Sequence, residues 1–199
     1  MASAKTHDEI EAYVRSLHPS LVEHIQRVRL EAQTLAKRFQ LDEDRVDLAT
    51  TAHDIARLTA ASELLRLAQE YHLQVHPVEE DLPVLLHGPV GAEWLRRRFA
   101  LDDHEVLEAI RWHSTATRGL SPLGKAVFLA DKLDLEKAGR YPFQPKVRAL
   151  AHEDLDAAVL YFLNQDLMSF LSKDGIAHPA SLEARNELIR KFRKTPDHR

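Results

Sequence analysis

The sequence predicts an all-α protein, a helical bundle folded as a single domain of 199 residues. Apolar residues recur at steps of three and four along almost the whole chain, which is the spacing of helices that bury one face. No segment alternates between apolar and polar residues over the length of a strand. The length suits one domain, and neither a linker nor an internal repeat divides the chain.

The N-terminal half begins with three predicted helices. The first spans residues 20–39, where Ser20 is a suitable N-cap and Glu23, three residues later, completes a capping box. The apolar spacing continues through 43–57 and, after a short break, through 60–71. We therefore expect three separate helices in this part of the chain.

In the rest of the chain, prolines indicate where several helices begin. Pro83 and Pro89 suit first-turn positions, so we expect the stretch 78–99 to divide near His87 and Gly88. Ser121 supplies N-cap chemistry ahead of Pro122. The remaining helices are expected at 102–113, 121–135, 155–171 and 181–192, with a loop at 139–145 and a short helix before residue 155.

The composition limits the chemistry. The chain has no Cys, which excludes disulfides, zinc–thiolate sites, iron–sulfur clusters and cysteine nucleophiles. Its formal net charge is −4, without the basic surplus of a nucleic-acid-binding protein, and no apolar run is long enough for a membrane span. The polar start of the chain lacks a signal peptide, and the absence of Cys fits a cytoplasmic protein. The 12 His are unusual. A metal bound here would have nitrogen and oxygen ligands only.

Three polar residues occupy positions where the helical spacing calls for core residues. They are His24, His113 and Asp131. Burying an ionised carboxylate without a partner is costly, so Asp131 needs a cation, either Lys132 or an arginine, or a metal ion. Taken singly, each histidine is more often a hydrogen-bonded core residue. Taken together with the carboxylate, the two imidazoles favour a metal.

The dipeptide His53-Asp54 is informative only through its context. About one such dipeptide is expected by chance in this composition, and His7-Asp8 in the polar N-terminal segment is a second example. His53-Asp54, however, lies in an apolar segment. It also falls within an ordered series of inward-facing polar residues, which reads His24, His53, Asp54, His87, His113, Asp131.

That series resembles the pattern of the HD-domain phosphohydrolase superfamily. The strings at 85–92 (LLHGPVGA), 109–114 (AIRWHS) and 128–132 (FLADK) resemble its YqeK branch in particular. The resemblance extends over about residues 19–187. It implies an all-helical HD domain that cleaves diadenosine tetraphosphate, a nucleotide substrate, symmetrically into two ADP. It also implies a dinuclear centre of transition-metal ions, commonly iron, with Mn, Co or Ni also suited to such ligands.

The resemblance assigns roles to individual residues. It implies that His24, His53, Asp54 and Asp131 hold one metal, and that Asp54 bridges to a second metal held by His87 and His113. Two ions about 3.5–4 Å apart would share and deprotonate the attacking water, so that His53, Asp54 and Asp131 are also the expected catalytic residues. Basic residues within or near the motifs are expected to bind the polyphosphate: Arg57, Arg118, Lys125, Lys132 and Arg140.

The chain departs from the branch at several positions. Arg57 replaces a lysine, Ser114 stands where threonine is common, and the segment after Asp131 is about two residues longer than usual. Either Lys137 or Arg140 could supply the displaced phosphate contact there, and we favour Arg140.

Three alternative functions remain open from the sequence. They are a nucleotidase or other phosphohydrolase acting on a mononucleotide, an HD-fold oxygenase that uses an iron pair, and a non-catalytic nucleotide-binding regulator. A homodimer is also open, because Phe162, Leu163 and Phe170 belong either to the core or to a dimer surface. Arg96, Arg97 and Arg98 are expected on a solvated helix face. The remaining histidines are expected at the surface or at helix caps: His18, His72, His76, His104, His152, His178 and His198.

Overall fold

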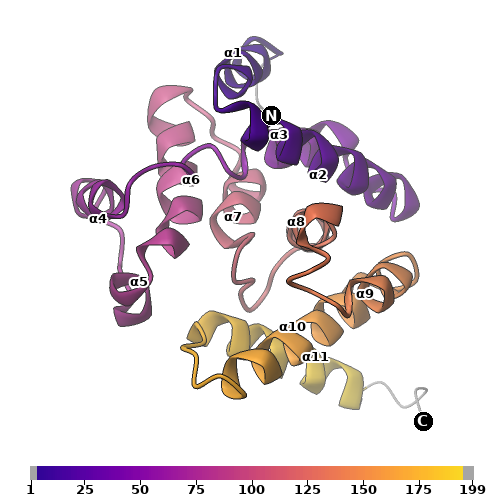
Figure 1. Ribbon diagram of the computed structural model, residues 1–199. Helices are drawn as coiled ribbons and strands as arrows, with labels where there is room; N and C mark the ends of the chain where they lie inside the picture. Colours follow the sequence, from indigo (N-terminus) through magenta and orange to yellow (C-terminus); the bar gives the residue numbers. More distant parts are fainter. Residues whose placement is uncertain (1–3, 195–199) are drawn as a thin grey trace.

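A computed structural model describes residues 4–194 and confirms the all-α prediction, since it contains no strand within that range. Figure 1 shows the helices packed in groups, with α1–α3 at one end and α10 and α11 at the other. The elements are α1 (Ala4–Arg15), α2 (Pro19–Arg38), α3 (Glu43–Ala52), α4 (Ala61–Glu70), α5 (Pro77–Asp81), the 3-10 helix η1 (Pro83–Leu86), α6 (His87–Arg98), α7 (His104–Trp112), α8 (Pro122–Lys132), the 3-10 helix η2 (Leu135–Lys137), α9 (Gln144–Ala151), α10 (Leu155–Leu171) and α11 (Pro179–Lys194).

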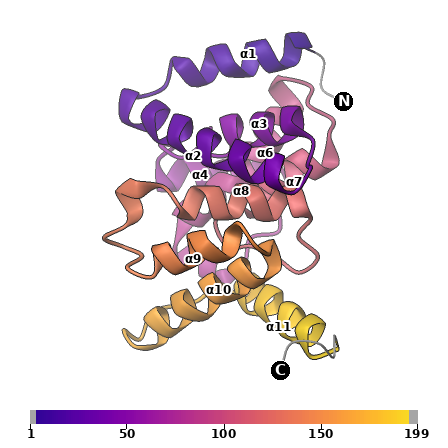
Figure 2. The same ribbon diagram turned by 90° about the vertical axis from the view of Figure 1, so that its right-hand side faces the viewer.

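Helix α8 lies at the centre of the molecule, between α2 and α3 on one side and α9 and α10 on the other (Figure 2). Its residues Val127 and Ala130 belong to the apolar cluster shared with α1–α4, α6 and α7. Phe128 and Leu129 belong instead to the cluster shared with α9, α10 and α11. A helix that buries residues on all sides is typical of a core element. Asp131, near its end, is therefore held on a rigid support.

Several predicted boundaries are confirmed. The chain divides at His87, where η1 ends and α6 begins, and α10 has the predicted bounds. The Ser121 side chain accepts a hydrogen bond from the Gly124 amide at 3.1 Å, as expected of an N-cap. Phe162 and Leu163 are core residues, 2% and 1% exposed.

Other boundaries were wrong. Helix α1 was not predicted, because its segment is polar apart from a few residues such as Ile10 and Val14, which are buried against the rest of the fold. The helix expected to reach residue 57 ends at Ala52, and the one expected to reach residue 135 ends at Lys132. Ile55 is buried although it lies beyond the helix, so its burial extended the apolar pattern past the true end.

The predicted capping box of Ser20 and Glu23 was also wrong, because α2 begins one residue earlier with His18 as its N-cap. The His18 ring accepts a hydrogen bond from the Ser20 amide at 3.3 Å. The same His-Pro arrangement recurs at His76 and His178, whose rings accept from the amides two residues further on at 3.1 and 3.2 Å. These three histidines are caps, as predicted, whereas His198 lies outside the described residues.

The arginine run after Glu93 forms a surface face, as predicted. Arg96 and Arg97 pair with Glu93 at 2.8 and 3.1 Å, and the Arg98 guanidinium lies over the Trp94 ring. Within residues 4–194, no helix combines the length and the apolar character that a bilayer crossing requires.

Candidate metal centre

Three of the predicted ligands share one local arrangement at helix ends. His53 follows α3, His113 follows α7, and His87 follows η1. In each case the ring Nδ1 is hydrogen-bonded to the carbonyl oxygen three residues earlier, at 2.7 Å for His53 and His113. The last carbonyls of a helix have no partner within the helix, so a histidine placed there can bind one of them. A carbonyl only accepts, and Nδ1 therefore carries the proton in all three rings.

The fourth histidine is oriented differently. His24 lies in the second turn of α2, and its Nδ1 is 2.5 Å from Oδ2 of Asp134, just beyond the end of α8. Arg27, one turn after His24, donates to the same carboxylate through Nε at 2.7 Å and through a terminal nitrogen at 3.1 Å. Burial opposes ionisation of Asp134, but the hydrogen bonds from Arg27 and His24 lower its pKa below the usual value. The carboxylate is therefore ionised and accepts the His24 Nδ1 proton.

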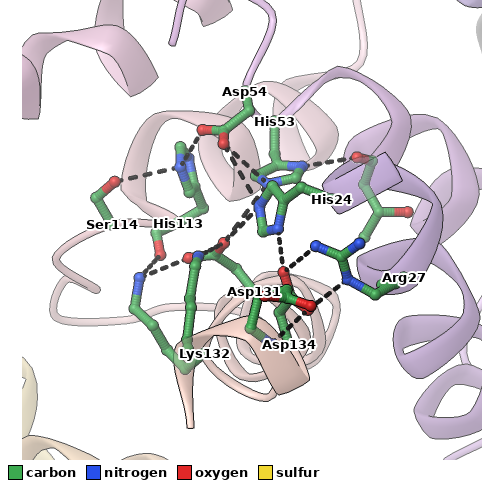
Figure 3. A network of polar contacts seen from close by, with 12 residues as sticks. His24, Arg27, His53, Asp54, His113, Ser114, Asp131, Lys132 and Asp134 are labelled. Atoms are coloured by element: carbon green, nitrogen blue, oxygen red, sulfur yellow. Dashed lines mark hydrogen bonds and ion pairs between the residues drawn. The ribbon is translucent and has the colours of Figure 1, made fainter. Parts of the chain in front are cut away.

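The opposite ring nitrogens of all four histidines face Asp54 and Asp131 (Figure 3 labels His24, His53 and His113). Oδ1 of Asp54 is 2.9 Å from Nε2 of His87 and 3.3 Å from Nε2 of His113. Oδ1 of Asp131 is 3.2 Å from Nε2 of His24 and 3.6 Å from Nε2 of His53. Both carboxylates are 4% exposed. The six predicted metal ligands are thus brought together from five separate parts of the chain.

The positions of the ring protons make this cluster of histidines and carboxylates suitable for binding cations. With its proton on Nδ1, a histidine ring in its neutral form presents a lone pair at Nε2, the nitrogen that faces the centre in all four rings. The Nε2 atoms of His87 and His113 are 2.9 Å apart, and both also face a carboxylate oxygen. The Nε2 atoms of His24 and His53 are buried without a hydrogen-bond partner. Acceptors that converge in this way repel one another unless a positive ion lies among them.

Two overlapping groups of donor atoms lie close enough to hold an ion. His24, His53 and Asp131 form one, and His53, Asp54 and His113 form the other, with the donor atoms of each group within 4.8 Å of one another. Imidazole nitrogens and carboxylate oxygens, without thiolates, are ligands that suit divalent transition metals.

The electrostatics favour cation binding. Burial raises the pKa of Asp54 and Asp131, but the neighbouring histidines outweigh it for Asp54, and Lys132 and Lys137 do so for Asp131, so that both pKa values lie well below the usual range. Burial also lowers the pKa of His113 to about 4, which keeps that ring neutral near pH 7. Burial opposes protonation of His53 as well, yet Asp54 and Asp131 raise its pKa. The two carboxylates thus attract positive charge into the centre.

The residues predicted to bind the polyphosphate lie at very different places. Lys132 is at the centre, with Nζ 2.7 Å from Oδ2 of Asp131 and 3.1 Å from the carbonyl of His113. Lys125 forms an ion pair at 2.6 Å with Asp156 in the first turn of α10. Arg118 is 72% exposed and lies 3.9 Å from Glu187. Two others are exposed: Arg57, and Arg140, whose guanidinium lies over the Tyr141 ring at 5.2 Å.

Three residues of the centre were missed or passed over in the sequence. Lys137 on η2, the residue we ranked below Arg140, contacts Oδ1 of Asp131 directly. Arg27 and Asp134 together orient His24. Arg27 carries a signal that could have been noticed, since it follows His24 by three residues and so shares its helix face. Asp134 has no local signal for this role, because its side-chain partners His24 and Arg27 lie more than a hundred residues away.

Comparison with known proteins agrees with the fold and the cluster. Residues 21–136 match the HD domain family. The chain therefore belongs to the HD domain family of metal-dependent phosphohydrolases, as its motifs predict.

Its similarity to individual proteins is more specific. It is 32% identical over 175 residues to the symmetrical bis(5′-nucleosyl)-tetraphosphatase of Halalkalibacterium halodurans, covering 86% of this chain and 92% of the relative. It is 28% identical over 166 residues to the protein of the same name from Bacillus subtilis, covering 83% and 88%. A crystal structure of a predicted HD superfamily hydrolase involved in NAD metabolism, from Clostridium acetobutylicum, superposes with a TM-score of 0.86. That protein is 26% identical in sequence, and the match covers 92% of this chain and 97% of the other.

Proposed function

We propose that this protein hydrolyses diadenosine tetraphosphate and related dinucleoside polyphosphates symmetrically, giving two nucleoside diphosphates. One observation carries the proposal: four imidazole Nε2 lone pairs converge on two buried carboxylates. The similarity to symmetrical bis(5′-nucleosyl)-tetraphosphatases over most of the chain supports the choice of substrate. We also propose a cytoplasmic location for the enzyme, which the absence of Cys suits.

The ligand set suggests two ions that share Asp54. In this proposal His24, His53, Asp54 and Asp131 hold one, and His87, His113 and Asp54 hold the other. Iron is the proposed metal, and Mn, Co or Ni suit the same donors. When bound, the ions would acidify the attacking water and neutralise charge on the phosphoryl oxygens.

The chain's own residues bind and orient the substrate. Lys132 and Lys137 place two ammonium groups beside Asp131, where they can neutralise a polyphosphate that carries several negative charges. The Ser114 hydroxyl lies 3.2 Å from Nε2 of His113 and 3.4 Å from Nε2 of His87, so it lines the same centre. Four other basic residues remain predicted contacts of the dinucleoside polyphosphate: Arg57, Arg118, Lys125 and Arg140.

The reaction balances with one water. Its oxygen forms a bond to one β-phosphorus, and the bond from that phosphorus to the central bridging oxygen breaks, with the electron pair leaving on the second nucleoside diphosphate. Of the two water protons, one stays on the new phosphate or passes to solvent, and the other neutralises the leaving oxygen. Both products are ADP when the substrate is diadenosine tetraphosphate.

The proposal is tested by counting metals in the purified protein and assaying diadenosine tetraphosphate with and without added metal. We expect two transition-metal ions per chain and hydrolysis that is lost on chelation and restored by metal. Fewer than one ion per chain after loading, together with no hydrolysis, overturns the proposal. Phosphate release from mononucleotides in place of ADP formation would identify the chain as a nucleotidase that uses the same centre.

A further inference from the structure

We propose that Asp134 is a positioning residue that holds His24 as a metal ligand and so controls the occupancy of one metal position, that formed by His24, His53 and Asp131. The inference rests on the proposed function, because it concerns the affinity of that centre for its ions. It assigns a role to a residue that no motif of the sequence marked.

His24 is the one ligand histidine of the described chain whose orientation depends on a side chain. The other three rings are held by main-chain carbonyls at their own helix ends. His24, by contrast, lies far from the C-terminal end of α2, in a part of the helix whose main-chain carbonyls are engaged, so its Nδ1 needs an acceptor from outside. The carboxylate of Asp134 supplies it at 2.5 Å.

Asp134 is itself held rigidly. Arg27 binds both of its oxygens, at 2.7 and 3.1 Å, in the two-point geometry that gives guanidinium–carboxylate pairs their directional strength. The Glu136 amide adds a third donor at 3.2 Å, and the Asp134 side chain is only 1% exposed. A carboxylate that accepts from a ligating histidine fixes its tautomer and increases the basicity of the nitrogen that faces the metal.

The same carboxylate links two parts of the centre. Asp134 caps the start of η2, and Lys137 at the end of η2 contacts Asp131. Asp134 therefore connects α2, which carries His24, to the turn that carries a cation onto the second carboxylate (Figure 3 shows His24, Arg27, Asp131 and Asp134). Within the described residues, the Asp134 carboxylate bonds neither His87 nor His113, whose rings are held by main-chain carbonyls.

The test is a titration of the metal-free full-length chain with Mn²⁺, followed by calorimetry and by elemental analysis after dialysis. We expect Asp134→Asn to weaken one of two Mn²⁺ sites about 10- to 100-fold and to leave the other unchanged. In a double-mutant cycle, Asp134→Asn should cause no further loss when His24→Ala is already present, because asparagine can still cap η2 and the lost carboxylate acts through the His24 ring.

Asp103→Asn is the matched control. Asp103 is likewise buried, bound at both oxygens by an arginine (Arg45, at 2.8 and 2.5 Å), and accepts a main-chain amide, but within residues 4–194 its carboxylate pairs with no histidine. It should lose stability without change in Mn²⁺ affinity. Arg27→Gln keeps the carboxylate on His24 and should give a smaller loss at the same site, which also covers the case in which Asp134→Asn does not fold.

The outcomes separate the two claims. A wild-type chain that binds no Mn²⁺ overturns the proposed metal centre. If the wild-type chain binds Mn²⁺ at two sites, the metal centre stands, and any of three results overturns the role of Asp134 alone. These are unchanged Mn²⁺ affinity in both Asp134→Asn and Arg27→Gln, equal weakening of both sites, or losses of affinity that add to those of His24→Ala.

Discussion

Gly88 lies where α6 crosses the last turn of α7, and replacing it with alanine should disturb both the packing and the metal centre. A Cβ at this position would lie 2.6 Å from the Arg111 carbonyl oxygen and 3.0 Å from that of Ile110. Those atoms are main chain and cannot swing aside. The Ile110 carbonyl is also the acceptor that orients the His113 ring at 2.7 Å. The two helices must therefore separate, and the anchor of a ligand must move.

The size of the effect follows from these contacts. Overpacking by a methyl group costs about 1–3 kcal/mol, and the gain in helix propensity returns at most about 1 kcal/mol. We expect Gly88→Ala to lower the free energy of unfolding by about 1–2 kcal/mol. Gly91→Ala in the same helix is the control, because its Cβ would approach a single side-chain methyl, Cγ2 of Ile55, at 3.2 Å and no main-chain atom closer than 4.0 Å. That variant should be close to wild type or slightly more stable.

Urea unfolding of the two metal-free variants measures the difference directly, since the extrapolated free energies compare like with like. Mn²⁺ titration then shows whether the His113 side of the centre is weakened in Gly88→Ala alone. The reasoning is refuted if Gly88→Ala is as stable as Gly91→Ala, or if both variants bind the metal as wild type does.

Three further predictions concern single side chains. Asp54→Ala should lower the turnover of diadenosine tetraphosphate more than about 100-fold, because it removes a ligand shared by both metal positions. His7→Ala should leave turnover unchanged, and equal steady-state rates for the two variants would contradict the proposed site. Lys137→Gln should lower kcat/KM about tenfold, which corresponds to the loss of one charge-assisted hydrogen bond. Its effect should exceed that of Arg140→Gln, and the reverse order would favour Arg140 as the phosphate contact, as the sequence suggested. The Arg45 hydrogen bonds lower the pKa of Asp103, so the ionised carboxylate stabilises the fold above its unfolded pKa near 4, and this stabilisation is lost as the pH falls through the lower pKa of the folded state. Urea unfolding should therefore show a lower free energy of unfolding for Asp103→Asn than for wild type at pH 7, and no difference in acid. A difference that persists in acid would contradict this.

Local pattern in the sequence was sufficient for the fold class and for recognising three of the ligands as inward-facing polar residues. Helical spacing placed His24, His113 and Asp131 on buried faces, and burial of such groups needs a physical reason that a cation provides. Their convergence was inferred from the resemblance to a family, and the structure brings the six side chains together.

What the sequence could not show depends on contacts between distant segments. Apolar spacing continued through Ile55 because that residue is buried, although the helix had ended at Ala52. The burial pattern reports where a side chain goes and does not report where main-chain hydrogen bonding stops. Asp134 was missed for a related reason, since its role depends on His24 and Arg27 in another helix. Lys137 was ranked below Arg140 because sequence spacing does not tell which side chain of a short turn points inward.

The central claim is symmetrical hydrolysis at this centre, and it is tested most directly by digesting diadenosine tetraphosphate in water enriched in heavy oxygen and analysing the products by mass spectrometry. The account predicts ADP as the sole nucleotide product, with the heavy oxygen on the terminal phosphate of half of the ADP molecules. Formation of AMP and ATP, or ADP that carries no heavy oxygen, would contradict it.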